Sequence, residues 1–221
     1  MEQRAHFHKK LEELKMQVLR MAALSEKAVH SSIKAYLEYD SDLAEDVIMG
    51  DIEINDLENA IDRFNLELLA LDQPMAKDLR GIVGAMRITM NLERLGDEAV
   101  NLAHRALFLS TRPPLPYNQK MEQLTEVSKR MLSAALKSFV EEDSKLAEQV
   151  CAMDNEADEL SIKLLKQYIN DMVTETRIVE RGVHAIMAAR HLERVGDLAT
   201  NVAETVIFIV EGENVKHRCR G

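Results

Sequence analysis

The sequence predicts an all-α protein of two tandem, sequence-related three-helix bundles, with six long antiparallel helices. Three observations predict this fold. Leu, Ala, Met, Glu and Lys dominate, and the 221 residues include only 8 glycines, 4 prolines and no tryptophan, which favours helices. The chain also repeats itself at an interval of about one hundred residues, as duplicated structural units do. Three of the prolines fall together near the middle, between the two copies.

The internal repeat is visible in two pairs of segments. Residues 91–101 read NLERLGDEAVN and residues 191–201 read HLERVGDLATN, an offset of 100. Residues 36–47 read YLEYDSDLAEDV and residues 139–150 read FVEEDSKLAEQV, an offset of 103 with seven of the twelve positions identical. A deletion of three residues between these segments reconciles the offsets. Matching segments in the same order indicate a duplication.

The first half contains three predicted helices. Apolar residues at helical spacing predict a first helix over about residues 7–39. The Asp40-Ser41 pair then offers side-chain oxygens that cap a second helix, which ends at about residue 71. Pro74 fits the first turn of a third helix, where its missing N–H is not needed, and this helix continues to about residue 110.

The second half repeats this pattern after a linker. Residues 111–117 read TRPPLPY, and three prolines in four positions cannot continue a helix. The linker divides the chain into a first bundle over residues 1–112 and a second over residues 113–221. The second bundle has predicted helices at about residues 119–142, 144–172 and 175–211. Helices of this length measure ~45 Å, and we expect the two bundles to lie end to end.

An acidic pair recurs on the third helix of each half. Glu93 and Asp97 are four residues apart, so they share one face beside the core stripe and repel each other modestly. Gly96 between them costs a helix interior roughly 1 kcal/mol relative to Ala, and it permits another backbone to approach closely. The second half repeats both the repelling acids and the glycine in the helix interior, as Glu193, Asp197 and Gly196. Because both features are unfavourable, their repetition indicates that they serve a function.

The second helix of each half carries a matching pair. Asp51 and Asn55 are four residues apart, as are Asp154 and Asp158. If the second and third helices pack side by side, each half gathers about four oxygen-bearing side chains. Such clusters suit hard or borderline cations such as Mg, Ca, Mn or Fe.

A plainer interpretation of the same residues stays open at this point. They are then solvated acids on an acidic protein, and Arg94 and Arg194 are their neutralising partners. His184 and His191 lie on the helix that carries the second acidic pair, and we expect both to be structural histidines with satisfied hydrogen bonds.

At these residues the chain resembles the PhoU family of phosphate-uptake regulators. The resemblance rests on ERLGD and ERVGD, each followed by Asn four residues on, on the segments GDIEIN, MDNEAD and DSDLAE, and on QP before the third helix. It covers nearly the whole chain and both repeats. It implies two similar three-helix bundles and a cytosolic homodimer. Its implied partners are the ATPase subunit of a phosphate ABC transporter and a phosphate-sensing histidine kinase. Members restrain phosphate-starvation signalling when phosphate is plentiful.

The resemblance also implies multinuclear metal sites, since some family members bind iron or zinc clusters at paired acidic motifs. The first site falls on Asp51, Asn55, Glu93 and Asp97, and the second falls on Asp154, Asp158, Glu193 and Asp197. Asn55 departs from the carboxylate pattern and lowers the negative charge of the first site by one, so we expect the first site to hold metal more weakly. Iron, zinc and manganese are the expected metals.

Composition and sequence pattern limit where the chain is expected to be located and which partners it is expected to bind. The net charge is −10, which makes nucleic acid a poor partner. The N-terminus has no apolar region typical of a signal peptide, and no apolar run approaches the ~20 residues that span a bilayer. Cys151 and Cys219 form no CxxC pair, which favours a reduced chain without disulfides. We therefore expect a cytoplasmic protein that reaches the membrane only through protein partners.

Three function classes remain. The leading hypothesis is a non-enzymatic signalling adaptor of phosphate homeostasis. A carboxylate-bridged metal enzyme is the first alternative, although the Glu-x-x-His motif of such sites is absent from the sequence. A purely structural helical scaffold is the second, and it leaves the duplicated acidic pairs unexplained.

The sequence gives no sign of direct phosphate binding. It contains no Gly-rich phosphate loop and no basic cluster. We therefore expect information about phosphate to arrive through protein partners or through a bridging metal.

Overall fold

The predicted all-α fold is confirmed. The computed structural model describes residues 2–72 and 74–215, and these residues form helices without a β-strand. The elements are α1 (Glu2–Glu38), α2 (Ser41–Asp72), α3 (Ala76–Ser110), α4 (Gln119–Glu141), α5 (Ser144–Thr174), the short 3₁₀ helix η1 (Thr176–Ile178) and α6 (Val179–Glu211). Across the described residues, no helix has both the length and the apolar character that crossing a bilayer requires.

The turn between the first two helices of each repeat has the same geometry twice. Asp40 Oδ1 accepts a hydrogen bond of 3.0 Å from the Leu43 N–H, and Asp143 Oδ1 accepts one of 3.1 Å from the Leu146 N–H. The predicted caps are therefore confirmed. Just before each cap lies a residue with left-handed backbone, Tyr39 (φ 57°) and Glu142 (φ 53°). Because these residues stand 103 apart, the duplication preserves the turn even where the residue type differs.

Two predicted helix starts are wrong. Pro74 precedes α3 instead of forming its first turn, because Met75 is extended (φ −124°, ψ 150°) and is the cap residue. In the second repeat, Glu175 is also extended, and the 3₁₀ helix η1 comes before α6. That short turn places Ile178 in the core, where it is buried, and α6 begins at Val179.

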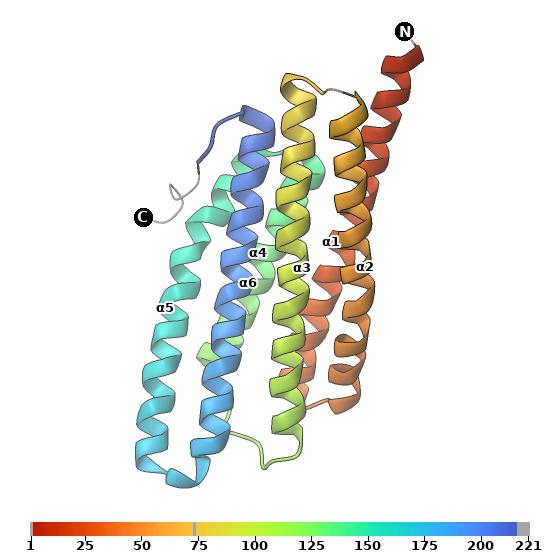
Figure 1. Ribbon diagram of the computed structural model, residues 1–221. Coiled ribbons are helices and arrows are strands. Elements are labelled where there is room, and N and C mark those ends of the chain that lie inside the picture. The colour runs from red at the N-terminus through yellow and green to blue at the C-terminus, as the bar shows by residue number, and fades with distance from the viewer. Residues whose placement is uncertain (1, 73, 216–221) are drawn as a thin grey trace.

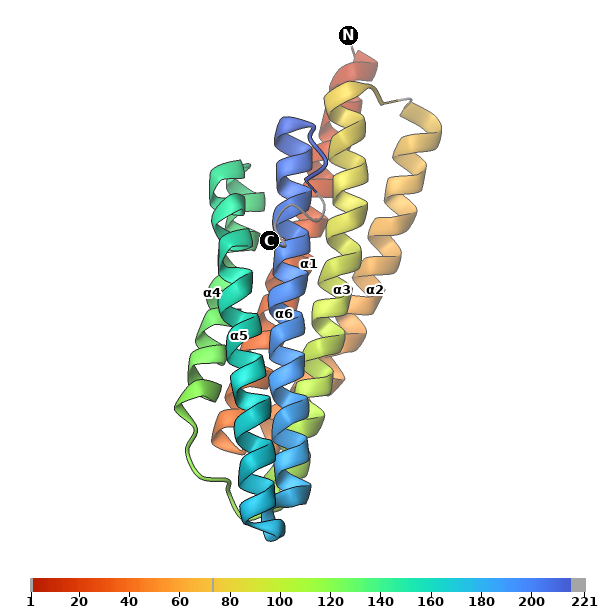
Figure 2. The same cartoon turned by 90° about the vertical axis from the view of Figure 1, so that its left-hand side faces the viewer.

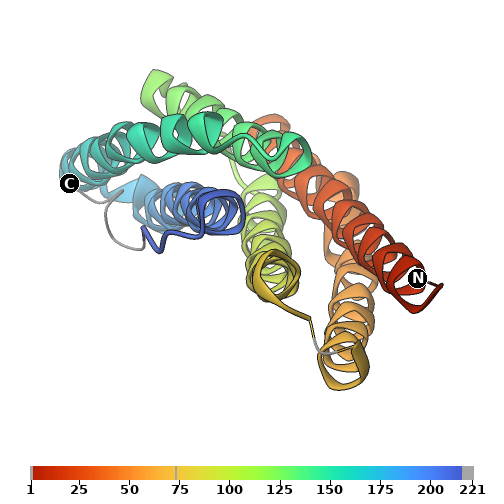
Figure 3. The same cartoon turned by 90° about the horizontal axis from the view of Figure 1, so that it is seen from above.

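The two repeats lie side by side, so the expected end-to-end arrangement is wrong. Figure 1 shows α3 and α6 running antiparallel at the centre of the molecule, with α2 beyond α3 and α5 beyond α6. The view turned by 90° shows the same order (Figure 2). From above, α1 and α4 cover one side of this central pair (Figure 3). The long axes of the two bundles therefore run parallel to each other, and α3 and α6 form the seam between the bundles.

Small residues allow the seam to be tight. A Cβ atom added to Gly84 of α3 would lie 2.3 Å from Ile209 Cγ1 of α6, so only glycine fits there without a shift of Ile209. Both helices also contain many buried alanines, whose small side chains permit close packing against neighbouring helices. The buried alanines of the two helices are Ala85, Ala99, Ala103, Ala106, Ala185, Ala188, Ala189, Ala199 and Ala203.

A buried hydroxyl links the first and third helices in each repeat. Ser25 Oγ donates to the Leu92 carbonyl at 2.9 Å, and Ser128 Oγ donates to the Leu192 carbonyl at 2.9 Å. Both serines are fully buried. Since an unpaired buried hydroxyl is unfavourable, the Ser25 bond favours one sliding position of α1 on α3. The Ser128 hydroxyl also lies 2.8 Å from the Leu124 carbonyl of its own helix, so its constraint on α4 and α6 is weaker.

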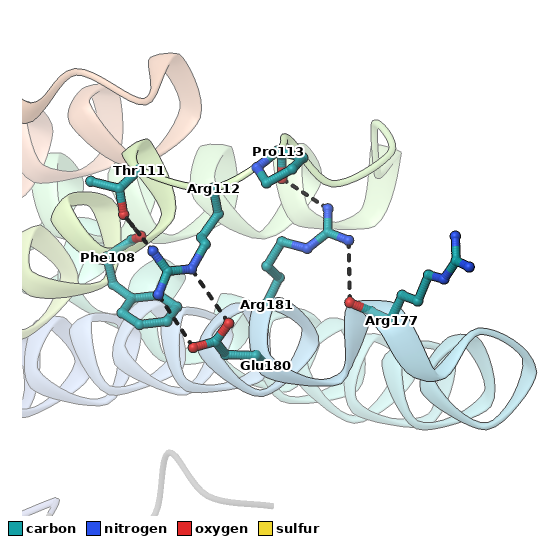
Figure 4. A network of polar contacts seen from close by, with 7 residues as sticks. All are labelled: Phe108, Thr111, Arg112, Pro113, Arg177, Glu180 and Arg181. Carbon is teal, nitrogen blue, oxygen red and sulfur yellow. Dashed lines mark hydrogen bonds and ion pairs between the residues drawn. The ribbon is translucent and has the colours of Figure 1, made fainter.

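The linker between the repeats is held against the start of α6. The guanidinium of Arg112 contacts both carboxylate oxygens of Glu180 at 3.4 Å and lies over the Phe108 ring (Figure 4). Arg181 Nη1 donates to the Pro113 carbonyl at 2.8 Å. Prolines provide carbonyl acceptors without N–H donors, so an arginine is a suitable partner for this segment.

Cys151 is buried and disulfide-bonded. The expectation of a chain without disulfides is therefore wrong, because separation along the sequence does not report distance in the fold. Cys219 lies outside the described residues.

The close packing of α3 on α6 predicts that alanine substitution has opposite effects on stability at two glycines of α3. Gly81 has open space where a Cβ would lie, so Gly81→Ala should raise the free energy of unfolding by about 0.5–1 kcal/mol through helix propensity. Gly84→Ala must displace Ile209, so it should lower the free energy of unfolding by about 1 kcal/mol. Urea denaturation of both variants measures the difference. Equal stabilisation by the two substitutions would contradict the close packing of α3 on α6.

Candidate functional site

The first acidic cluster lies between α2 and α3, as the sequence predicts. Asn55 Nδ2 donates to Asp51 Oδ2 at 2.8 Å, so the two α2 residues are joined. Gly96 of α3 lies opposite, where an added Cβ would come within 2.8 Å of Asp51 Oδ1 and 3.2 Å of Ile54 Cδ1. The glycine therefore makes room for a carboxylate side chain and an isoleucine, and not for another backbone as we expected.

The carboxylates of this cluster influence one another. Burial raises the pKa of Asp51, the hydrogen bond from Asn55 lowers it, and the charge of Asp97 raises it further. Burial is also the main cause that raises the pKa of Glu93, followed by the charges of Asp97, Glu58 and Asp51, while Arg94 opposes them. Such coupling shows that negative charges gather here in a partly dehydrated space.

Glu58 is a fourth acid of the first cluster, and the sequence did not reveal it. Burial raises its pKa, and the charges of Asp62 and Asp97 add to the effect. Glu58 lies seven residues after Asp51, which is the helical spacing that could have revealed it. The repeat could not reveal it, because the equivalent position in the second half is Ser161.

The second acidic cluster lies between α5 and α6. Asp154 is buried, and its Oδ1 accepts a hydrogen bond of 3.2 Å from Thr200 Oγ1. Burial raises the pKa of Glu193, and the charges of Asp197, Asp158 and Asp154 raise it further, while Arg190 lowers it. The structure thus brings together the four residues predicted in each half.

The donor chemistry of the clusters suits a hard cation, although the side chains do not converge as a finished metal site. Among the described residues, no three His, Cys, Asp or Glu side chains are grouped so that they could hold a metal ion. Asp51 Oδ1 is buried and has no hydrogen-bond partner. A dehydrated carboxylate oxygen without a donor is unfavourable, and either a proton or a cation relieves it.

Arg194 does not neutralise the second cluster, so that part of the plainer interpretation is wrong. Its Nε lies 3.2 Å from Glu98 Oε1, across the seam on α3. His191 Nδ1 lies 2.7 Å from Glu98 Oε2, and the Glu98 side chain is only 4% exposed. His191 is therefore a structural histidine, as predicted. His184 is one as well, since its ring stacks on Phe108 at 3.6 Å.

A groove between α3 and α6 was also missed. It has a volume of about 390 Å³ and contains two arginines, although the sequence has no basic run. Helical spacing places Arg87 and Arg94 two turns apart on the same face of α3. The groove is lined by Arg87, Met90, Asn91 and Arg94 of α3, by Asn201, Glu204 and Thr205 of α6, and by Asn214.

The comparison with known proteins identifies the family. The PhoU domain family matches residues 18–106 and 121–206, one segment in each repeat. The chain belongs to the PhoU family. The resemblance seen in the sequence motifs is thereby confirmed.

Relatives match along the whole chain. The phosphate-specific transport system accessory protein PhoU homolog of Aquifex aeolicus is 40% identical over 210 residues, covering 95% of each chain. The homolog of Xylella fastidiosa is 33% identical over 205 residues, covering 93% of this chain and 86% of the relative.

Solved structures share the fold. The crystal structure of PhoU from Pseudomonas aeruginosa has a TM-score of 0.91 at 35% identity, covering 94% of this chain and all of that one. The structure of the phosphate transport system regulatory protein PhoU from Streptococcus pneumoniae has a TM-score of 0.87 at 27% identity, covering 95% and 99%.

The raised pKa values make a prediction about stability and pH. An acid whose pKa is higher in the folded state binds its proton more tightly there, so metal-free protein should lose stability as the pH rises from about 4.5 through the raised pKa values of Glu93 and Glu193. Glu93→Gln and Glu193→Gln should each raise the free energy of unfolding at pH 7, by roughly 0.2–0.5 kcal/mol per relieved i,i+4 pair.

Thermal unfolding of chelator-treated protein between pH 4.5 and 8 measures this effect. Glu45→Gln is the matched control, because Glu45 is an exposed acid of α2 outside the cluster. A gain of the same size from Glu45→Gln would attribute the effect to net charge and not to the clusters.

Proposed function

We propose that this protein regulates phosphate uptake as an accessory of a phosphate-specific transport system, and that it restrains phosphate-starvation signalling when phosphate is plentiful. The observation that carries the proposal is similarity along the full chain, 40% identity over 95% of both sequences, to a relative named as an accessory protein of that system. Both repeats and the linker are included in the match, so the likeness extends to a complete relative and not to one shared module.

The proposed action is non-enzymatic contact, from the cytoplasm, with two proteins: the transporter's ATPase subunit and a phosphate-sensing histidine kinase. The net charge of −10 supports docking on proteins instead of lipid, because the anionic inner leaflet repels an acidic surface. The proposed assembly is a homodimer, and sedimentation equilibrium is the measurement of its mass.

Metal at the two acidic clusters is part of the proposal. A bound cation would supply the positive charge that the carboxylates lack. Asp51, Asn55, Glu93 and Asp97 would hold it in the first repeat, and Asp154, Asp158, Glu193 and Asp197 would hold it in the second. Asn55 turns its NH₂ toward Asp51, so its oxygen can become a ligand only if that hydrogen bond breaks. This supports weaker binding in the first repeat.

The metal proposal predicts the result of elemental mass spectrometry. Protein purified without chelator or nickel resin should carry stoichiometric iron, zinc or manganese, and the double variant Asp97→Ala/Asp197→Ala should lose it because each substitution removes a carboxylate from one cluster. The matched control is Glu45→Ala/Glu148→Ala, which removes two exposed acids at equivalent positions and should keep the metal. A metal-free wild type that is fully folded would show the clusters to be protein-docking or structural features.

The regulatory proposal predicts the behaviour of a phosphate-starvation reporter. In cells that lack their own copy of the regulator, the reporter should stay active in high phosphate, and expression of this chain should repress it at least several-fold. Tagged protein should co-purify with the transporter ATPase and the sensor kinase from the same cells. Repression without capture of either partner would contradict the contact mechanism, and capture without repression would contradict negative regulation.

A further inference from the structure

The two repeats differ at a position on the seam, where one has an acid and the other has a leucine. Arg194 of α6 pairs with Glu98 of α3 at 3.2 Å. The repeat offset of 100 makes Arg94 the equivalent of Arg194, and it makes Leu198 the equivalent of Glu98. The residue that would neutralise Arg94 by analogy is therefore a leucine. Within the described part of the chain, neither a hydrogen bond nor an ion pair engages the Arg94 guanidinium.

The space beside Arg94 is the groove described above. It extends along α3 from Arg94 to Arg87, whose guanidinium is held over the Phe208 ring at 4.5 Å. Stacking fixes the position of Arg87 without using its N–H donors, because the ring contacts the face of the guanidinium. Two arginines seven residues apart stand about 10.5 Å apart along the helix, so both side chains reach a ligand placed between them.

Polar side chains complete the wall of the groove. Asn91 Nδ2 donates to the Arg87 carbonyl at 2.8 Å, and Thr205 Oγ1 donates to the Asn201 carbonyl at 2.8 Å. Both bonds fix side chains that border the groove. The Asn201 amide faces the same space and offers further N–H donors. The groups that can donate to an anion in this groove are therefore the two guanidiniums and the Asn201 amide N–H groups.

Glu204 is the carboxylate among the described residues that line the groove. A carboxylate repels a fully ionised oxyanion, but it accepts a hydrogen bond from the P–O–H group of a hydrogenphosphate or a phosphate monoester. Sulfate has no proton at neutral pH and cannot donate that bond. The combination of two arginines and one glutamate therefore favours phosphate over sulfate.

We propose that the groove between α3 and α6 is a binding site for a phosphate group, with Arg87 and Arg94 as its cationic ligands. The site goes beyond the proposed function, since it would let the regulator sense phosphate directly. It also departs from our expectation from the sequence that information about phosphate arrives through protein partners or through a bridging metal.

The affinity has an upper limit from the size of the ligand. The best small ligands gain about 1.5 kcal/mol per non-hydrogen atom, so the five atoms of orthophosphate cannot bind tighter than roughly micromolar. The groove volume of about 390 Å³ exceeds one phosphate ion, so a phosphate ester could also occupy it. Both sources share the same phosphate chemistry, and the experiment below distinguishes them.

The test is isothermal titration calorimetry of the full chain after chelator treatment, with orthophosphate, adenosine monophosphate and sulfate as probes. Chelator treatment removes phosphate binding through a metal. We expect phosphate binding in the micromolar to millimolar range and weaker sulfate binding. Arg94→Gln should weaken phosphate binding by about 10- to 100-fold, as expected for loss of a charged hydrogen-bond donor. Arg63→Gln, which removes an exposed arginine of α2, should have no effect.

A second variant restores the missing acid instead of removing the arginine. Leu198→Glu introduces on α6 the carboxylate that Glu98 supplies on α3, so it should pair with Arg94 and weaken phosphate binding to a similar degree. Circular dichroism and thermal unfolding verify that each variant is folded. If Leu198→Glu unfolds the protein, Arg94→Gln against Arg63→Gln still decides the question.

The outcomes separate clearly. Orthophosphate binding that Arg94→Gln weakens would support a free-phosphate site, and tighter adenosine monophosphate binding with the same dependence would support a phosphate-ester site. The proposal would be overturned if neither ligand gave a heat of binding at 10 mM. That concentration is on the order of ten times the weakest dissociation constant we expect. Binding that is equal in Arg94→Gln and wild type would overturn it as well. Neither result affects the contact with the transporter, which the reporter and capture experiments test separately.

Discussion

The packing of α3 against α6 is the contact on which the rest of the structure depends. Each of these helices also packs against the other two helices of its own repeat, so the seam joins the two bundles through their most buried elements. Gly84 lets α3 approach α6 closely, and the Glu98 carboxylate fixes the register of the two helices because it contacts both Arg194 and His191. A carboxylate with 4% exposure would be costly if either helix slid by one turn and left it unpaired.

The acidic clusters follow from this arrangement. Because α3 and α6 face each other, the opposite sides of both helices are left to α2 and α5, and the acidic pairs lie in those outer interfaces. Their carboxylates are partly dehydrated and close together, and Asp51 Oδ1 has no donor. The buried core holds these groups in place against their repulsion, so the energy that would be released by a counter-charge is already stored in the folded state.

Much of the fold and of the clusters could be predicted from the sequence because both rest on periodicity. Leu92, Leu95 and Ala99 follow helical spacing and are buried, and the i,i+4 acids lie together as that spacing requires. Periodicity assigns a residue to a face but does not say which neighbour covers that face. The side-by-side packing of the repeats was therefore missed, since it depends on what meets Gly84. The pairing of Arg194 with Glu98 was missed for the same reason, because it depends on a contact between helices. Glu58 was missed because the second repeat has Ser161 at the equivalent position, although its helical spacing from Asp51 was visible.

The ion pair between Glu98 and Arg194 at the seam also bears on symmetry. Two identical three-helix units packed about a two-fold axis would carry the glutamate–arginine contact twice or not at all, because each unit would present the same residues to the other. Joining the units in one chain removes that restriction. One end of the seam is then free to close with Glu98 and Arg194, while the other keeps Leu198 and an open, arginine-lined groove. Fusion in one chain thus allows two equivalent parts of one interface to carry different side chains and different contacts. An assembly of identical subunits could not do this.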